Sequence, residues 1–161
     1  MGVLSLAEDF SCPIAASRIF KALMVDQKNL IPKLLPQFIA SVDVIQGDGG
    51  AGTIEQINFT EASEFKYVKH RIDELDHENF ACKYSLIEGD VLGDKLESID
   101  HEVKFEPAAA DGGCVCKITS KYNTEGDFSV SEEEIKAGKE KAMAIFKVVE
   151  SYLQENPDAY A

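Results

Sequence analysis

The chain has 161 residues, of which 45% are hydrophobic, so it is long enough for one compact domain with its own core. Its 29 acidic and 16 basic side chains give a formal net charge of −13, which repels nucleic-acid phosphates and anionic membrane surfaces. These values predict a single domain over residues 1–161 and argue against nucleic acid or a membrane as its partner.

The first residues lack the basic and apolar regions of a secretory signal, and no apolar run is long enough to span a membrane. Of the four cysteines, Cys114 and Cys116 alternate along a predicted strand, a spacing that suits neither zinc binding nor redox chemistry. We therefore expect a cytoplasmic protein with reduced thiols, no metal and no other cofactor.

Alternating residue types predict that the chain begins with a strand, which ends at Pro13. Two short helices are predicted over 15–24 and 26–34, and Pro36 stops the second. The strand that follows carries four apolar residues on one face: Phe38, Ala40, Val42 and Val44. Strand patterns then recur at 53–60, 64–73, 79–88, 95–106 and 114–123. Because short turns separate these segments, we expect an antiparallel meander.

One side of this predicted sheet is consistently apolar. In the 64–73 segment the apolar face changes parity between Tyr67 and Val68, which predicts a β-bulge at that point. The apolar side has four polar interruptions, namely Tyr67, His70, Tyr84 and His101.

A capping box over 131–134 predicts the start of a long helix, which nothing interrupts before Pro157. About two dozen residues span about 36 Å, so the sheet must curve to cover the apolar stripe of the helix. The stripe carries small residues such as Gly138 and Ala142 in its first half and larger ones in its second half. We expect unfilled space between helix and sheet, with direct contact at Gly138 as the alternative.

Before the 53–60 segment lies a loop rich in glycine, made of Gly47, Asp48, Gly49, Gly50, Ala51 and Gly52. Backbone N–H groups can converge in such a loop and bind an anion. A nucleotide-binding Walker loop, however, carries a lysine and enters a helix, whereas this loop enters a strand. We interpret it as a hairpin loop, with phosphate binding as the alternative.

Several segments together resemble the plant class-10 pathogenesis-related proteins, relatives of the major birch-pollen allergen. They are Met1 to Val3, Phe20 to Ala22, the glycine-rich loop with Thr53, Lys66 to His70, Tyr84 to Asp90, Lys121 and Tyr122, Val149 to Leu153, and Asp158 to Tyr160. The resemblance implies an α+β helix-grip fold, in which a seven-stranded antiparallel sheet wraps around a long C-terminal helix beside two short helices. It also implies a large apolar cavity in a small, intracellular, stress-induced protein that binds cytokinins, flavonoids, sterols or similar amphiphiles.

The resemblance also implies which positions line the cavity. These are Phe38, Ile57, Phe59, Phe65, Tyr67, His70, Tyr84, Leu86, Ile99, His101, Cys116, Ile118, Gly138, Lys139, Ala142 and Ile145. Aromatic faces would stack on planar ligands, while the tyrosines and histidines would orient the ligand by hydrogen bonding. Each histidine could instead be a satisfied core or surface residue.

Ribonuclease activity has been ascribed to members of this family, and the corresponding residues here are Glu97, Glu150 and Tyr152. RNA would have to approach a strongly acidic protein, and Glu55 stands beyond the loop where relatives often carry lysine. We therefore interpret Glu150 as a structural anion that accepts hydrogen bonds from the loop.

Some distant members of this family catalyse condensation reactions with a cavity lysine, for which Lys139 is the candidate here, but the sequence shows no acid and base converging on it. The abscisic-acid receptors share the fold, but this chain lacks their His-Arg-Leu latch. The sequence thus predicts a monomer that binds and stores a small amphiphilic plant metabolite or hormone, with ribonuclease activity as the alternative.

Overall fold

The computed structural model describes the chain apart from residues 1, 49, 63–64, 90–91, 93–95, 109–111, 125–131 and 161. Within the helices and strands, the side chains of residues 2, 132, 134, 137–139 and 141–142 are also outside the description. The elements, in chain order, are β1 (Gly2–Cys12), α1 (Ala16–Phe20), the π-helix η1 (Lys21–Val25), α2 (Gln27–Leu34), β2 (Ile39–Gln46), β3 (Ile54–Phe59), β4 (Tyr67–Asp76), β5 (Ala81–Gly89), β6 (Leu96–Pro107), β7 (Cys114–Thr124) and α3 (Glu132–Glu155).

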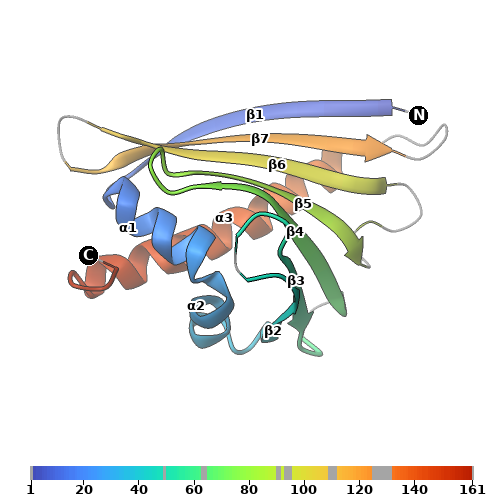
Figure 1. Cartoon of the computed structure of the whole chain (residues 1–161), viewed down its shortest axis with the longest axis horizontal. Helices are drawn as coiled ribbons and strands as arrows, with labels where there is room; N and C mark the ends of the chain where they lie inside the picture. The colour runs from blue at the N-terminus through green and yellow to red at the C-terminus, as the bar shows by residue number, and fades with distance from the viewer. Residues whose placement is uncertain are drawn as a thin grey trace.

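The strands form one seven-stranded sheet in the order β1-β7-β6-β5-β4-β3-β2, and every neighbouring pair is antiparallel. Figure 1 shows the sheet curving over α3, with α1 and α2 near the end of the molecule where α3 finishes. The helix-grip architecture that the sequence predicts is therefore confirmed, and the predicted strands agree with the observed ones to within a few residues.

The apolar stripe of α3 holds the helix against the sheet. Ile135, Phe146, Val149 and Leu153 are all buried, at helical spacings that place them on one side. They pack into two clusters of buried side chains that lie at different ends of α3. The space between these clusters is where the candidate site lies.

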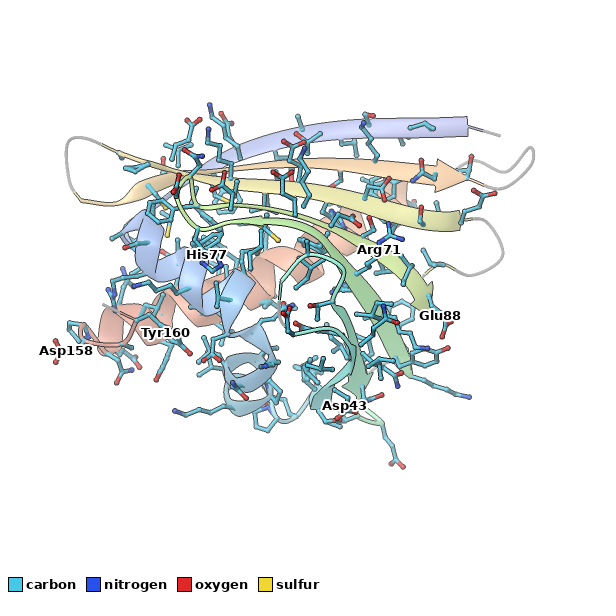
Figure 2. All side chains as sticks on the ribbon, viewed as in Figure 1. Asp43, Arg71, His77, Glu88, Asp158 and Tyr160 are labelled. Atoms are coloured by element: carbon cyan, nitrogen blue, oxygen red, sulfur yellow. The ribbon has the colours of Figure 1, made fainter. Side chains whose placement is uncertain are left out.

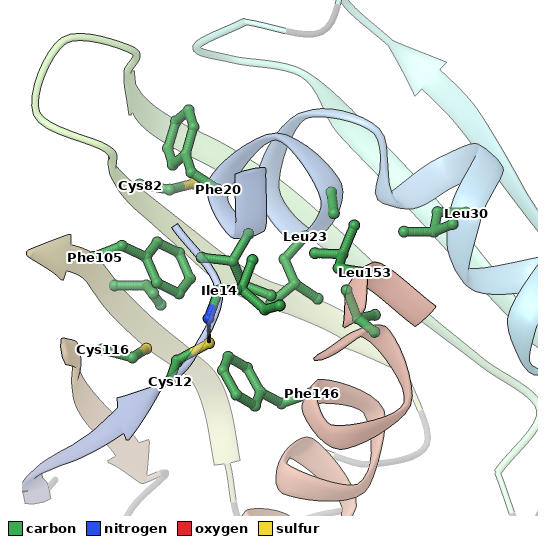
Figure 3. Close-up of a cluster of buried hydrophobic side chains, with 14 of the residues drawn as sticks. Cys12, Ile14, Phe20, Leu23, Leu30, Cys82, Phe105, Cys116, Phe146 and Leu153 are labelled. Atoms are coloured by element: carbon green, nitrogen blue, oxygen red, sulfur yellow. Dashed lines mark hydrogen bonds between the residues drawn. The ribbon is translucent and has the colours of Figure 1, made fainter. Parts of the chain in front are cut away.

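The larger cluster, called here the first cluster, surrounds the C-terminal half of α3. Figure 3 shows Phe20 from α1, Phe105 from β6, and Phe146 and Leu153 from α3 gathered in it. The second cluster surrounds the start of α3 and consists of Val68, Leu86, Leu92, Ile99, Tyr122 and Ile135. Each cluster combines side chains from the sheet with side chains from α3, so the helix is fixed at both ends.

The helix expected over 15–24 is irregular. It begins as α1 and continues as η1, where the N–H of Asp26 bonds to the carbonyl oxygen of Lys21 at 2.8 Å. This bond spans five residues and is characteristic of a π-helix.

The predicted face of the strand after Pro36 is wrong at two positions. Phe38 precedes β2, in a turn closed by its N–H to the carbonyl oxygen of Leu35, and its side chain is 47% exposed. Within β2 a bulge between Ile39 and Ser41 inserts one residue, so Ile39 faces the core and Ala40 is exposed. The inward phase resumes at Val42.

The bulge predicted between Tyr67 and Val68 is also wrong. Pairing of β3 with β4 is continuous there, and the irregularities of β4 occur against β5, after Lys69 and after Ile72. Because neighbouring side chains alternate, Tyr67 lies on the face opposite to Val68. Its hydroxyl donates to Oε2 of Glu88 at 2.8 Å. In Figure 2 the labelled Glu88 lies near the end of β5, apart from α3.

Candidate functional site

Four polar side chains cross the inner face of the sheet between the two apolar clusters. They are His70 from β4, Tyr84 from β5, His101 from β6 and Ser120 from β7, called here the polar row. On each of these strands, residues of the second cluster lie on one side of the row and residues of the first cluster on the other. The position of the row follows from strand alternation, because each member shares the inward phase of its apolar neighbours.

The members of the row are in contact with one another. The ring centroids of His70 and Tyr84 are 5.3 Å apart, and those of Tyr84 and His101 are 5.0 Å apart. Nδ1 of His101 lies 2.9 Å from Oγ of Ser120, within hydrogen-bonding distance. All four side chains are only half-buried although they face inward, so the described side chains do not fill the space beside them completely.

A small cavity opens at the β4 end of the row. Its volume is about 20 Å³, and it is lined by Met24, Gln27, Glu55, His70, Ile72, Cys82 and Tyr84. The helices η1 and α2 contribute the first two of these residues, and β3, β4 and β5 contribute the rest. The cavity therefore lies between the short helices and the inner face of the sheet.

Burial controls the charge of the groups around this cavity. Burial lowers the pKa of His70 to about 4, helped by the nearby charge of His101, and it lowers the pKa of His101 to about 4 as well. It raises the pKa of the Tyr84 hydroxyl and of the Glu55 carboxyl above their usual values. Near pH 7 both imidazoles are therefore neutral, and each has one donor and one acceptor nitrogen.

The predicted site does not include six residues of the row and the cavity: Met24, Gln27, Glu55, Ile72, Cys82 and Ser120. Glu55 shares the alternation of Ile57 and Phe59, so the pattern of β3 contained the signal that its side chain points inward. Gln27 had no comparable signal, because its position depends on how α2 packs against the sheet.

Other predicted cavity residues divide by position. Leu86 and Ile99 belong to the second cluster and Cys116 to the first, while Ile118 and Ile145 pack against the first cluster and Ile57 and Phe59 against both. Phe65 precedes β4 and is half-buried, and the structure does not bring Phe38 or Tyr67 to the polar row. The predictions for Gly138, Lys139 and Ala142 concern side chains outside the described part of the chain.

The glycine-rich loop joins β2 to β3 as a hairpin connection. Three of its N–H groups bond within the protein: Gly50 to Oδ1 of Asp48, Gly52 to the carbonyl oxygen of Ile72, and Thr53 to that of Gly50. These three donors are therefore engaged in holding the loop and not directed at an anion. Gly49 lies outside the described residues.

The three residues of the ribonuclease alternative are not brought together. Glu97 is exposed on β6, near Ile99 and hence near Ile135 at the start of α3. Glu150 lies about 22 Å farther along α3 at 1.5 Å per residue.

Glu150 and Tyr152 contact lysine side chains. Oε2 of Glu150 lies 3.4 Å from Nζ of Lys147, and the ring of Tyr152 lies 5.4 Å from Nζ of Lys33. The N–H groups of Gly50, Gly52 and Thr53 bond to other acceptors, so the predicted support of the loop by Glu150 does not occur through them.

Comparisons with known proteins agree with this geometry. The model of the pathogenesis-related protein Bet v 1 family matches residues 1–156. The chain is 49% identical over 160 residues to the major strawberry allergen Fra a 1.07 of Fragaria ananassa and, over the same length, to the major allergen Pru av 1 of Prunus avium. Each alignment covers 99% of both chains.

Solved structures share the fold. The crystal structure of Ara h 8.0201 superposes with a TM-score of 0.87 at 34% identity, covering 96% of this chain and 100% of that one. Norcoclaurine synthase from Thalictrum flavum, in complex with dopamine and hydroxybenzaldehyde, gives a TM-score of 0.72 at 22% identity over 96% of this chain and 88% of that one. Among the described residues, no helix is both long and apolar enough to cross a membrane.

Proposed function

Because the chain belongs to the Bet v 1 family of pathogenesis-related proteins, we propose that it binds and stores a small amphiphilic molecule between the inner face of the sheet and α3. The observation that carries this proposal is the half-buried polar row between two apolar clusters. Such a surface matches a ligand whose body is planar and apolar and whose edge carries a few polar groups.

The energetics favour this kind of ligand. Each Å² of apolar ligand surface removed from water contributes about 25 cal/mol, part of which offsets the cost of immobilising the ligand. Hydrogen bonds to Tyr84 and His101 then fix its orientation. Cytokinins, flavonoids and sterols have this combination of rings and polar edges, and norcoclaurine synthase, with the same fold, holds two small aromatic molecules.

The conditions in which the protein works follow from the same features. We propose a cytoplasmic location, because all four cysteines are free and buried, which suits a reducing compartment. We also propose that the protein is a monomer without cofactor, and that it acts in stress or defence, since its family is one of pathogenesis-related proteins.

The test is a thermal-unfolding screen with cytokinins, flavonoids, sterols and indoles, followed by calorimetric titration of the compounds that stabilise the protein. A ligand present at about 100 times its dissociation constant stabilises the folded state by about 2.7 kcal/mol, which raises the unfolding temperature measurably. Failure of every class to raise that temperature would contradict the proposal.

A further inference from the structure

Glu55 is a buried carboxylate in the wall of the small cavity. Its side chain comes from β3, is 5% exposed, and accepts a hydrogen bond from Nε2 of Gln27 to Oε2 at 3.3 Å. Lys28 adds a weaker favourable charge. A carboxylate offers about four acceptor positions, so one long hydrogen bond leaves most of its capacity unused. The carboxylate thus needs a further donor, and the cavity is the space from which one can come.

His70, on the neighbouring strand β4, also has an unused hydrogen-bonding position. Its Nδ1 atom is buried and has no hydrogen-bond partner among the described residues. β3 and β4 place Glu55 and His70 directly opposite each other in register, so both side chains point to the same face. A buried polar atom without a partner is uncommon in folded proteins and points to a group that is bound there.

The size and charge of the cavity limit what that group can be. Its volume of about 20 Å³ admits one water-sized group, whereas a carboxylate or a phosphate is larger. An anion would also be repelled by Glu55. A primary ammonium group has the size of a water molecule, carries the opposite charge, and has three N–H donors.

We propose that this cavity is the head-group site for a primary amine, whose nitrogen donates to the carboxylate of Glu55 and to Nδ1 of His70. The apolar part of the ligand would extend from there along the polar row. This inference rests on the proposed binding function and deepens it, since it names the ligand class as amphiphiles with a primary amine.

The experiment uses three probes with the same apolar body and different head groups: 2-(2-naphthyl)ethylamine, 2-(2-naphthyl)ethanol and 2-naphthylacetate. Their dissociation constants are measured by calorimetry with the wild-type protein. We expect the amine to bind about tenfold more tightly than the alcohol, as a charge-assisted hydrogen bond allows, and the carboxylate to bind most weakly.

Two variants test whether the preference for the amine depends on Glu55. Glu55→Gln keeps the shape of the side chain and removes its charge, so the amine should bind only as well as the alcohol. Glu150→Gln is the matched control, because it removes one buried carboxylate of the same charge that does not line the cavity. It should keep the wild-type preference, and circular dichroism checks that both variants are folded.

The outcomes separate the two proposals. If the alcohol and the amine bind equally to the wild-type protein, the cavity holds only water and the head-group proposal is overturned while ligand binding stands. If the preference for the amine persists in Glu55→Gln, the amine is bound elsewhere and the proposal is likewise overturned. If none of the three probes binds while a compound of the thermal-unfolding screen does, the head-group proposal is overturned and ligand binding stands; if that screen fails as well, the binding function fails too. A shift of the His70 imidazole nitrogen resonances on adding the amine supports direct contact without any variant.

Discussion

The phenol ring of Tyr84 lies between the imidazoles of His70 and His101 and borders the small cavity. Tyr84→Phe keeps the ring and its packing but removes the hydroxyl. We expect the affinity for ligands with a polar edge to fall about fivefold to tenfold, the usual effect of losing one hydrogen bond, while the unfolding temperature changes little. Calorimetric titration measures the first effect and thermal unfolding the second. Equal affinities of both proteins across a ligand panel would remove Tyr84 from the binding site.

His70 also determines how stability depends on pH. Its pKa is about 4 in the folded protein and near 6.5 in the unfolded chain. Between these values the unfolded state binds more protons, so the free energy of unfolding falls as the pH is lowered through this range and is fully present above about pH 6.5. His70→Phe should remove up to about 2 kcal/mol of the loss between about pH 7 and about pH 5.

Urea unfolding at a series of pH values measures this effect. Tyr84→Phe is the matched control, because it removes a neighbouring polar group that does not titrate in this range and should keep the wild-type pH dependence. Identical pH profiles for His70→Phe and the wild type would show that His70 is not buried as a neutral imidazole.

At the residue scale, strand alternation accounts for what could be predicted. It placed His70, Tyr84 and His101 on the inner face, where the structure has them. Tyr67 was assigned to the same face only by assuming a bulge that does not occur. That Nδ1 of His70 is buried without a hydrogen-bond partner in the described part of the chain depends on how several elements pack around it, and no sequence pattern predicts it.

At the element scale, the end of α3 is held by a side chain from a distant part of the sequence. Nε of Arg18 donates to the carbonyl oxygen of Ala159 at 3.0 Å, and its Nη2 donates to those of Leu153 at 3.0 Å and Asn156 at 2.9 Å. The hydroxyl of Tyr160, labelled in Figure 2, also donates to Oδ2 of Asp26. A cation at this position complements the helix dipole and bonds to carbonyl groups in the last turn of α3 and just beyond its end.

Arg18→Met keeps most of the apolar stem and removes the three hydrogen bonds. We expect the free energy of unfolding to fall by about 2 kcal/mol, because three hydrogen bonds from a charged donor are lost, two of them part-buried. Chemical denaturation measures the change. Arg71→Met is the control, since Arg71 pairs with Asp73 on the exposed face of the sheet, and it should cost less than about 1 kcal/mol. Similar losses in both variants would argue against the capping role.

The glycine-rich loop is another element whose role can be tested by substitution. Gly47 has φ +98°, and a Cβ atom there would lie 2.6 Å from Oγ1 and 2.7 Å from Cα of Thr53, which is fully buried. Gly52 also has a positive φ, +88°, but a Cβ atom there would meet nothing within 4 Å.

Comparing the two alanine variants separates strain from collision. Gly52→Ala should lower the free energy of unfolding by about 1 kcal/mol, the cost of a left-handed backbone, whereas Gly47→Ala should cost about 2 kcal/mol more because Thr53 must also move. Denaturation of both variants provides the measurement. Equal effects would mean that the loop adjusts without disturbing Thr53.

At this scale the sequence predicts regular strands well, but it does not predict irregular segments or contacts between distant residues. Regular alternation predicted β5, β6 and β7 to within two residues at each end. The bulge in β2 and the π-helix η1 were not predicted, because both depend on how the chain packs against neighbouring elements. The capping of α3 by Arg18 joins residues more than 130 positions apart, a distance over which one sequence alone contains no pairing signal.

At the scale of the whole molecule, the fold was predictable because its parts depend on one another. A helix as long as α3 with a continuous apolar stripe needs a curved sheet to cover it, and the run of strand patterns before it supplies that sheet. The size of the space between them was not predictable, since it depends on the rotamers of many side chains. The cavity beside the polar row therefore had to come from the structure.

The net charge of −13 is also a property of the whole molecule, and it leads to a prediction about RNA. We expect no measurable binding of a fluorescently labelled single-stranded RNA in anisotropy titrations, even at low ionic strength, because the protein and the phosphates repel each other. We likewise expect that Glu97→Gln combined with Glu150→Gln leaves any residual RNA cleavage unchanged, since Glu97 lies on β6, two residues before Ile99 of the second cluster, whereas Glu150 lies on α3 next to Val149 of the first cluster. The double variant is compared with the wild type purified in parallel, so that a contaminating nuclease affects both equally. RNA cleavage that disappears in the double variant would contradict this prediction and support the ribonuclease alternative.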